Sequence, residues 1–133
     1  MKLTSRCEYA MLALVHLGRQ MTEELVSVDE IARAQKIPPK FLEQIMLALK
    51  RAKYVRSCKG RQGGYQLAKA ADKITLAEIV RLFDGAIAPT ESVSKYFYEP
   101  TPIEQEDQLV QVFREIRDWA AQKLETTTIG DVL

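Results

Sequence analysis

The fold is decided by residues 27–67, which read SVDEIARAQKIPPKFLEQIMLALKRAKYVRSCKGRQGGYQL. Apolar residues recur at helical spacing before and after the Ile37-Pro38 step. Proline cannot continue a helix but suits the first turn of a new one. The pattern therefore predicts helices over about residues 28–35 and 39–52. Two short helices joined by a tight turn form a helix-turn-helix.

The segment after the second helix predicts a β-hairpin. Residues 54–58 and 65–67 alternate as strands do, and the loop KGRQGG between them supplies the glycines that a tight reversal needs. A hairpin with a basic tip, placed directly after a helix-turn-helix, is the wing of a winged helix. The sequence therefore predicts a winged helix-turn-helix.

Other helix starts are marked by Ser or Thr followed three residues later by Glu, a pair that can satisfy two free backbone N–H groups. The apolar spacing that follows predicts helices over residues 5–19, 76–84 and 102–125, with Gly85 as the C-cap of the second. The four predicted capping pairs are Ser5/Glu8, Ser27/Glu30, Thr75/Glu78 and Thr101/Glu104.

The predicted fold class is mostly α with one small β-hairpin. Residues 1–85 form the winged helix-turn-helix domain, residues 86–101 form a loop, and residues 102–133 form a long dimerisation helix and tail. One face of the long helix is apolar, and a monomer would expose it as a large patch, so it predicts a homodimer centred on Ile116 and Trp119. This face consists of Leu109, Val112, Phe113, Ile116, Trp119, Ala120 and Leu124.

The formal net charge of +1 conceals a strong asymmetry. Residues 33–69 contain ten Lys or Arg and a single acid, Glu43, whereas residues 70–133 contain six Lys or Arg and twelve Asp or Glu. A basic block beside an acidic remainder indicates a polyanionic partner for the block, although a merely solvated basic face is the simpler alternative.

Several classes of protein are disfavoured by the sequence. No run of about 18 apolar residues predicts a membrane span, and Arg6 and Glu8 interrupt any apolar signal segment at the start. Two cysteines are too few for a disulfide framework, which favours a cytoplasmic setting. No triad, phosphate loop or paired carboxylates indicate an enzyme.

The start of the second helix in the helix-turn-helix should enter the major groove of DNA. Lysine can contact guanine and glutamate can accept from cytosine, but Glu43 can also pair with Arg33 or Lys36. Phe41 can contact a thymine methyl group or simply pack against the core. The residues expected at this end are Pro39, Lys40, Phe41, Glu43 and Gln44.

The hairpin tip suits the minor groove, where Lys59 and Arg61 bring positive charge. The glycines Gly60, Gly63 and Gly64 allow the backbone to approach DNA closely. The alternative interpretation of the same residues is an ordinary glycine turn with incidental cations. Further candidate DNA contacts, mostly to phosphates, are Ser27, Lys36, Arg56, Ser57, Gln62 and Tyr65.

Four stretches resemble one known family: MKLTSRCEYA at 1–10, SVDEIAR at 27–33, IPPKFLEQI at 37–45 and VRSCKGRQGGYQL at 55–67. They resemble the bacterial winged-helix regulators of the Rrf-two type, which include IscR, NsrR and CymR. The resemblance implies a homodimer that binds an imperfectly palindromic operator in double-stranded DNA and controls transcription, in response to an effector that the sequence does not identify. The alternative is a winged-helix module that binds protein instead of specific DNA.

The chain departs from this family in two places. Relatives that hold an iron–sulfur cluster usually carry three closely spaced cysteines in the loop before the long helix, but residues 86–101 contain none. Because such clusters need thiolate ligands, we expect no standard cluster, and we expect no other cofactor or metal. Lys59 stands where the family often has arginine, and it lacks the planar guanidinium fork.

The remaining chemical groups have simple interpretations beside functional ones. Cys7 and Cys58 are redox candidates, since a thiol near Arg56 and Lys59 can have a lowered pKa, although inert thiols are commoner. An acid near the start of the first helix assists cluster binding in some relatives, but the Ser5 capping pair explains Glu8 without a cofactor. His16 lies on an apolar face and is expected to be a satisfied core residue.

Overall fold

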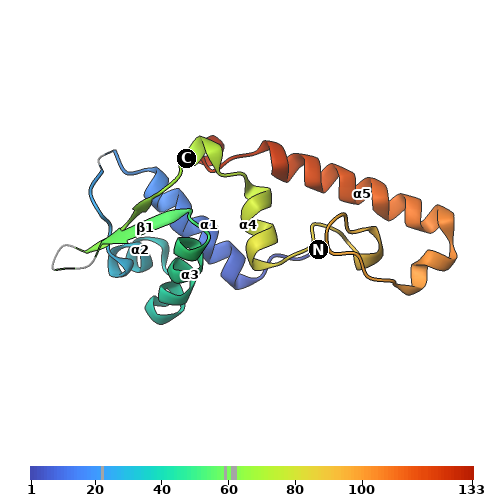
Figure 1. The fold of residues 1–133 in the computed structure, drawn as a ribbon, viewed down its shortest axis with the longest axis horizontal. Helices are drawn as coiled ribbons and strands as arrows, with labels where there is room; N and C mark the ends of the chain where they lie inside the picture. The colour runs from blue at the N-terminus through green and yellow to red at the C-terminus, as the bar shows by residue number, and fades with distance from the viewer. Residues whose placement is uncertain (22, 59, 61–62) are drawn as a thin grey trace.

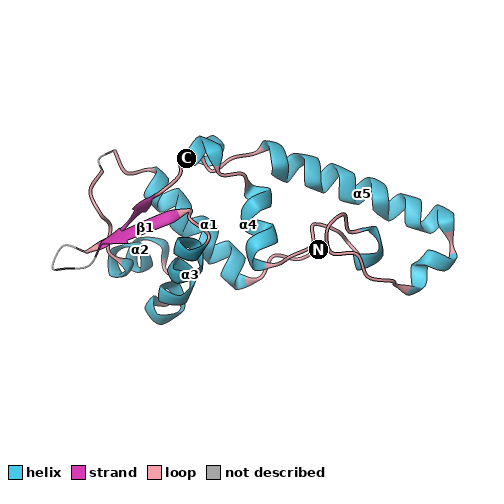
Figure 2. Cartoon of the chain, viewed as in Figure 1, coloured by secondary structure: helices cyan, strands magenta, loops and turns pink. Residues whose placement is uncertain are grey.

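The computed structural model describes residues 1–21, 23–58, 60 and 63–133. These residues form five α-helices and one two-stranded antiparallel sheet, so the chain is mostly helical, as predicted (Figure 2). The α-helices and strands are α1 (Ser5–Gly18), α2 (Val28–Gln35), α3 (Pro39–Arg51), β1 (Val55–Cys58), β2 (Gly64–Leu67), α4 (Leu76–Phe83) and α5 (Asp107–Thr126). Short 3₁₀ turns are η1 (Ala71–Lys73), η2 (Glu91–Val93), η3 (Pro102–Gln105) and η4 (Gly130–Val132).

Two of the predicted helix caps form. The Ser27 hydroxyl accepts from the Glu30 N–H over 3.1 Å and starts α2. At α4 the whole capping box is present: Thr75 accepts from the Glu78 N–H over 3.2 Å, and the Glu78 carboxylate accepts from the Thr75 N–H over 2.8 Å. In both caps the partners lie only three residues apart in sequence.

The predicted cap of α1 at Ser5 is wrong by one residue. The N-cap is Thr4, whose hydroxyl oxygen accepts from the Cys7 N–H over 3.3 Å. Asp84, just after α4, fixes this choice by accepting from both the Thr4 N–H, over 3.0 Å, and the Thr4 hydroxyl. Glu8 is therefore an exposed residue within α1, and it does not form a capping box with Ser5.

The predicted cap at Thr101 is also wrong. Its hydroxyl donates to Ser92 over 2.5 Å and accepts from Thr90 over 3.3 Å, so it does not cap the following turn. Only the short turn η3 starts at Pro102, and α5 begins at Asp107. The end of α4 also differs in detail, because Asp84 is the C-cap and Gly85 follows it with a φ of 82°.

The apolar core joins α1, α3 and α4. Its fully buried side chains include Leu14, Leu42, Ile45, Leu49 and Ile79. We call this part of the chain, with α2 and the hairpin, the winged body. The sequence predicts the winged helix, and the structure confirms it.

Residues 86–101 pack closely against α5 rather than hanging free. Ala88 and Val93 from this segment bury themselves against Val110, with Phe113 partly buried beside them. This small second core lies along the N-terminal half of α5, which extends away from the winged body (Figure 1).

The chain end after α5 returns to the winged body. Ile129 donates from its N–H to the Ile74 carbonyl over 2.8 Å, and Leu76 donates to the Thr127 carbonyl over 2.9 Å. The Ile129 side chain is fully buried. The C-terminal end of α5 is therefore fastened to the start of α4 by a short piece of antiparallel pairing. None of the described helices is long and apolar enough to cross a membrane.

Candidate nucleic-acid interface

The outer face of α3 presents four side chains at helical spacing. Lys40, Glu43, Gln44 and Leu47 are all exposed, while the opposite side of the helix is buried in the core. We call these four residues the α3 face. The sequence analysis predicted Lys40, Glu43 and Gln44 but missed Leu47. Leu47 follows Gln44 by three residues and Glu43 by four, and this helical spacing was enough to place it on the same face. Pro39 is also exposed, at the first turn.

Phe41 lies to one side of the α3 face. Its ring is half-buried and meets the ring of Tyr9 on α1 edge to face, with 5.6 Å between the centroids. Of the two interpretations open for Phe41, the structure favours packing against the core over contact with a base.

Glu43 faces the wing. No ion pair joins Glu43 to Arg33 or Lys36 in the described part of the chain, so the simpler interpretation of this acid is not supported. Burial, and next the negative charge of Glu43, raise the pKa of Tyr65 on β2. The Glu43 carboxylate therefore lies between α3 and the hairpin, and Glu43 is exposed to solvent.

The register of the hairpin divides the predicted wing contacts between two sides. Ser57 pairs with Tyr65, and Arg56 pairs with Gln66. Directly paired residues share a face and neighbours alternate, so Ser57 and Tyr65 lie on the side of α3, while Arg56 lies on the other. Arg56 lines a hollow of about 240 Å³ together with the acidic pair Glu23 and Glu24. The structure thus separates Arg56 from the α3 face.

Gly64 is needed for contact within the protein. A Cβ atom there would lie 2.5 Å from the carbonyl oxygen of Val26, just before α2. Tyr65 and Val26 exchange two backbone hydrogen bonds of 2.8 Å, which dock the hairpin onto this segment. A Cβ atom at Gly63 would also clash, at 2.7 Å from the Cys58 carbonyl. Of these three wing glycines, Gly60, with a φ of 128°, has open space around it, so its predicted close approach to DNA stays a prediction.

The other predicted contacts are placed in part. Ser27 is exposed, but its hydroxyl is used to cap α2. Lys36 is exposed at the turn between α2 and α3, in a left-handed conformation with φ of 58°. The predictions for Lys59, Arg61 and Gln62 fall outside the described residues.

The two cysteines have opposite environments. Cys7 is fully buried, and burial followed by the nearby Asp84 raises the pKa of its thiol to about 12. A thiol in this state is not a reactive thiolate, so the structure argues against a redox role for Cys7. Cys58 is exposed, on the same side of the hairpin as Arg56.

His16 differs from its expected state. It is only partly buried, and its Nε2 atom is buried without a hydrogen-bond partner among the described residues. The expectation that His16 is a satisfied core residue is therefore wrong for this nitrogen.

The apolar side of α5 splits into an inner and an outer part. Phe113 packs in the second core, and Ala120 and Leu124 pack against the winged body. The other four predicted residues point outward, with between 44% and 71% of each side chain exposed. We call these four the α5 stripe: Leu109, Val112, Ile116 and Trp119.

Comparisons with known proteins agree with this geometry. The family model Rrf2, described as "Iron-dependent Transcriptional regulator", matches residues 3–133. A Mycobacterium tuberculosis protein, named provisionally as an HTH-type transcriptional regulator, is 35% identical over 135 residues, which cover 99% of this chain and 81% of that protein. The HTH-type transcriptional regulator CymR of Bacillus subtilis is 29% identical over 132 residues, covering 99% and 89%.

Solved structures are similar over nearly the whole chain. The structure of B. subtilis CymR, described as the global cysteine regulator of that organism, has a TM-score of 0.79 at 27% identity and covers 99% of this chain and 95% of CymR. The structure of IscR from T. potens, at 24% identity, supports the fold alone, with a TM-score of 0.76 over 99% of this chain and 85% of that one.

Proposed function

Because the chain belongs to the Rrf2 family of transcriptional regulators, we propose that it binds a palindromic operator as a homodimer, with α3 in the major groove and the wing tip in the minor groove. That the chain is a DNA-binding regulator of transcription and not an enzyme follows from the family itself. The operator geometry, the dimer and the individual contacts are the content of the proposal.

The α3 face is the single observation that carries this proposal. It presents Lys40, Glu43 and Gln44 together at the first two turns of a helix that is anchored on its other side by the core. Recognition helices read base edges from this end. A carboxylate in a basic block is unfavourable near phosphates. Glu43 has no ion-pair partner in the described part of the chain, so its position is best explained if it accepts a hydrogen bond from the amino group of a cytosine.

The decisive experiment is selection of bound DNA from a random pool. We expect a two-fold symmetric consensus, and affinity that falls steeply with salt, with a slope near −0.9 per phosphate for roughly six to ten phosphates. A protein-interaction module would enrich no sequence, and any weak DNA binding would be indifferent to sequence.

Two substitutions separate base reading from backbone binding. Glu43→Ala is expected to change the preferred base at one position of each half-site, with discrimination reduced about tenfold, because it removes a base contact. Arg61→Ala is expected to weaken binding to all sequences alike and to lower the salt slope. Gel shifts against the selected operator and its single-base variants provide the measurement. Equal sequence preference in Glu43→Ala and the parent protein would contradict the role of Glu43.

The homodimer is proposed from the α5 stripe. Large apolar side chains that are half-exposed along one face of a helix form a patch that monomers rarely leave in water. Two-fold pairing would cover the patch with its own copy and place two α3 helices about one DNA turn apart, or a multiple of it.

The residues present do not fit the three-cysteine iron–sulfur cluster that the resemblance to cluster-holding relatives raises. Residues 86–101 contain no cysteine, and the buried polar side chains of this segment are the hydroxyls of Ser92 and Ser94. Cys7 is buried with a raised pKa, and Cys58 lies on the hairpin. The described residues contain no group of three His, Cys, Asp or Glu suited to a metal. We therefore propose regulation without a three-cysteine cluster.

Anaerobic purification tests this proposal. We expect a colourless protein without stoichiometric iron or sulfide, because the segment before α5 offers no thiolates. Visible absorption bands that disappear on treatment with a chelator, together with iron and sulfide in equal amounts, would refute it.

A further inference from the structure

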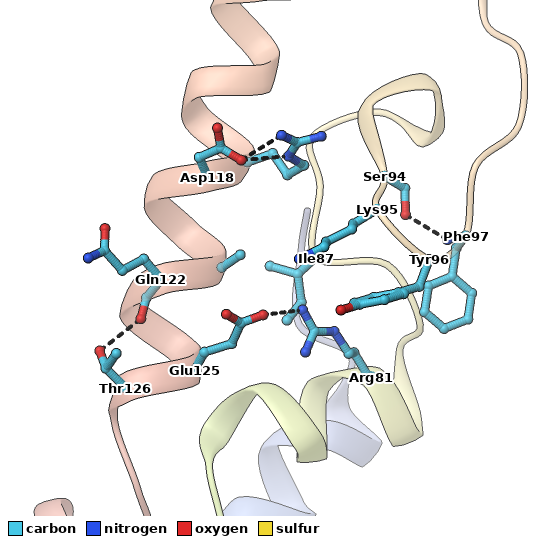
Figure 3. A pocket seen from close by; sticks show the side chains of 12 residues that line it. Arg81, Ile87, Ser94, Lys95, Tyr96, Phe97, Asp118, Gln122, Glu125 and Thr126 are labelled. Carbon is cyan, nitrogen blue, oxygen red and sulfur yellow. Dashed lines mark hydrogen bonds and ion pairs between the residues drawn. The ribbon is translucent and has the colours of Figure 1, made fainter.

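A hollow of about 170 Å³ lies between the end of α4, residues 87–97 and the C-terminal half of α5 (Figure 3). It lies on a different face of α5 from the α5 stripe, since the helix repeats every 3.6 residues. Its wall combines charge with apolar surface from Ile87, Phe97 and Ala121. The charged residues are three cations and two carboxylates: Arg81, Lys95, Arg117, Asp118 and Glu125.

The three cations differ in how many hydrogen bonds and ion pairs they make within the protein. Arg117 donates to the Val93 carbonyl over 2.8 Å and to the Asp118 carboxylate over 2.9 Å, so it is a structural group. Arg81 is held by one carboxylate, that of Glu125, at 2.6 Å. Lys95 has no carboxylate partner among the described residues. The wall therefore has one cation in excess.

An exposed aromatic ring lies at the mouth of the hollow. The Tyr96 ring lies between Lys95 and Arg81, with 5.4 Å and 5.0 Å from its centroid to the two cationic groups (Figure 3). The ring is 62% exposed, although the Arg81 side chain beneath it is only 25% exposed. A flat apolar molecule can pack against the exposed edge of such a ring while its charge reaches the guanidinium.

We propose that this hollow binds a small monocarboxylate with a flat apolar body, whose carboxylate replaces that of Glu125 on Arg81. A guanidinium binds carboxylates through two parallel hydrogen bonds, and one negative charge neutralises the one excess cation. A dianion such as phosphate is less suitable, because Glu125 and Asp118 would repel its second charge.

Such a ligand would act on DNA binding through the tie between two helices, a step that rests on the proposed function. Arg81 belongs to α4 in the winged body, and Glu125 belongs to α5, which carries the α5 stripe. Exchange of Glu125 for a ligand loosens this tie. The angle between the winged body and the dimer helix then changes, and operator affinity falls.

The test uses benzoate as the probe and the full chain in isothermal titration calorimetry. Benzamide has the same flat body without the charge, and we expect it to bind at least about tenfold more weakly than benzoate, because it lacks the charge-assisted bonds to Arg81. Inorganic phosphate is expected to bind more weakly than benzoate. Equal binding of benzamide, or tighter binding of phosphate, would overturn the assignment.

Two variants that break the same ion pair should move affinity in opposite directions. Arg81→Gln is expected to weaken benzoate binding about tenfold, because it removes the cation, while Glu125→Gln is expected to tighten it, because it removes the competing carboxylate. A purely structural effect would weaken binding in both. Lys95→Gln, at an exposed position, tests the excess charge without touching the ion pair and should weaken binding severalfold. Unchanged affinity in Lys95→Gln and Arg81→Gln would rule the site out.

A gel shift with the selected operator tests the regulatory step separately. We expect saturating benzoate to lower operator affinity in the parent protein. Arg81→Gln breaks the same tie itself, so its operator affinity should already be lowered in buffer and should not fall further with benzoate. Benzoate binding without any change in operator affinity would overturn the regulatory step. Absence of DNA binding in buffer without benzoate would contradict the proposed function instead, and calorimetry would still decide the site.

Discussion

Replacing Ile116 by Asp is expected to convert the proposed dimer into monomers and to weaken operator binding by at least about a hundredfold. Pairing of the α5 stripe would bury the new carboxylate without a partner, which costs several kcal/mol. A monomer also loses the gain of roughly 10²–10⁴ that comes from linking two half-site contacts. Light scattering gives the mass and a gel shift gives the affinity.

The matched control is Gln111→Asp, which adds the same charge to α5 at an exposed position outside the α5 stripe. It should remain a dimer with the affinity of the parent protein. Ile116 is itself 46% exposed within one chain, so Ile116→Asp should keep its helical circular dichroism. If Ile116→Asp is instead a well-folded dimer with unchanged affinity, the dimer contact lies elsewhere.

Replacing Gly64 by Ala is expected to undock the hairpin from the segment before α2. The added Cβ atom would meet the Val26 carbonyl oxygen at 2.5 Å, so the two hydrogen bonds between Tyr65 and Val26 must break or stretch. At about 1 kcal/mol for each bond, the free energy of unfolding should fall by roughly 2 kcal/mol, and operator affinity should fall with it. Urea unfolding measures the first quantity and a gel shift the second.

Cys58→Ala is the control for this change, since Cys58 pairs with Gly64 across the hairpin and is exposed. It should leave both stability and operator affinity unchanged in reducing buffer. Hydrogen exchange at the Tyr65 and Val26 amides localises the effect, and continued protection of both amides in Gly64→Ala would mean that the hairpin tolerates the side chain.

Local signals predicted the helices well where the cap and its partner are neighbours in sequence. Ser27 and Thr75 start α2 and α4 because the N–H groups that they satisfy lie three residues away. The capping role of Thr4 depends on its hydrogen bond to Asp84, which is distant in sequence. Thr101 does not cap the following turn because its hydroxyl bonds to Ser92, which belongs to another turn. Spacing along one segment cannot identify such partners.

The candidate interface follows the same division. Helical spacing was enough to place Lys40, Glu43 and Gln44 together, but the side of the hairpin taken by Arg56 depends on the register with β2. Which apolar residues of α5 are buried and which are exposed depends on how residues 86–101 pack against the helix. No periodicity in residues 86–101 predicts this packing.

The pairing of Thr75 with Thr128 fixes the rotational phase of α5 relative to the winged body. One residue inserted between Trp119 and this pairing would turn the α5 stripe by about 100° and shift it by about 1.5 Å. The two α3 helices of a dimer would then no longer face the same side of DNA. Changes in the length of this helix that preserve function are therefore expected to come in nearly whole turns, and each such turn would alter the spacing between half-sites as a discrete step.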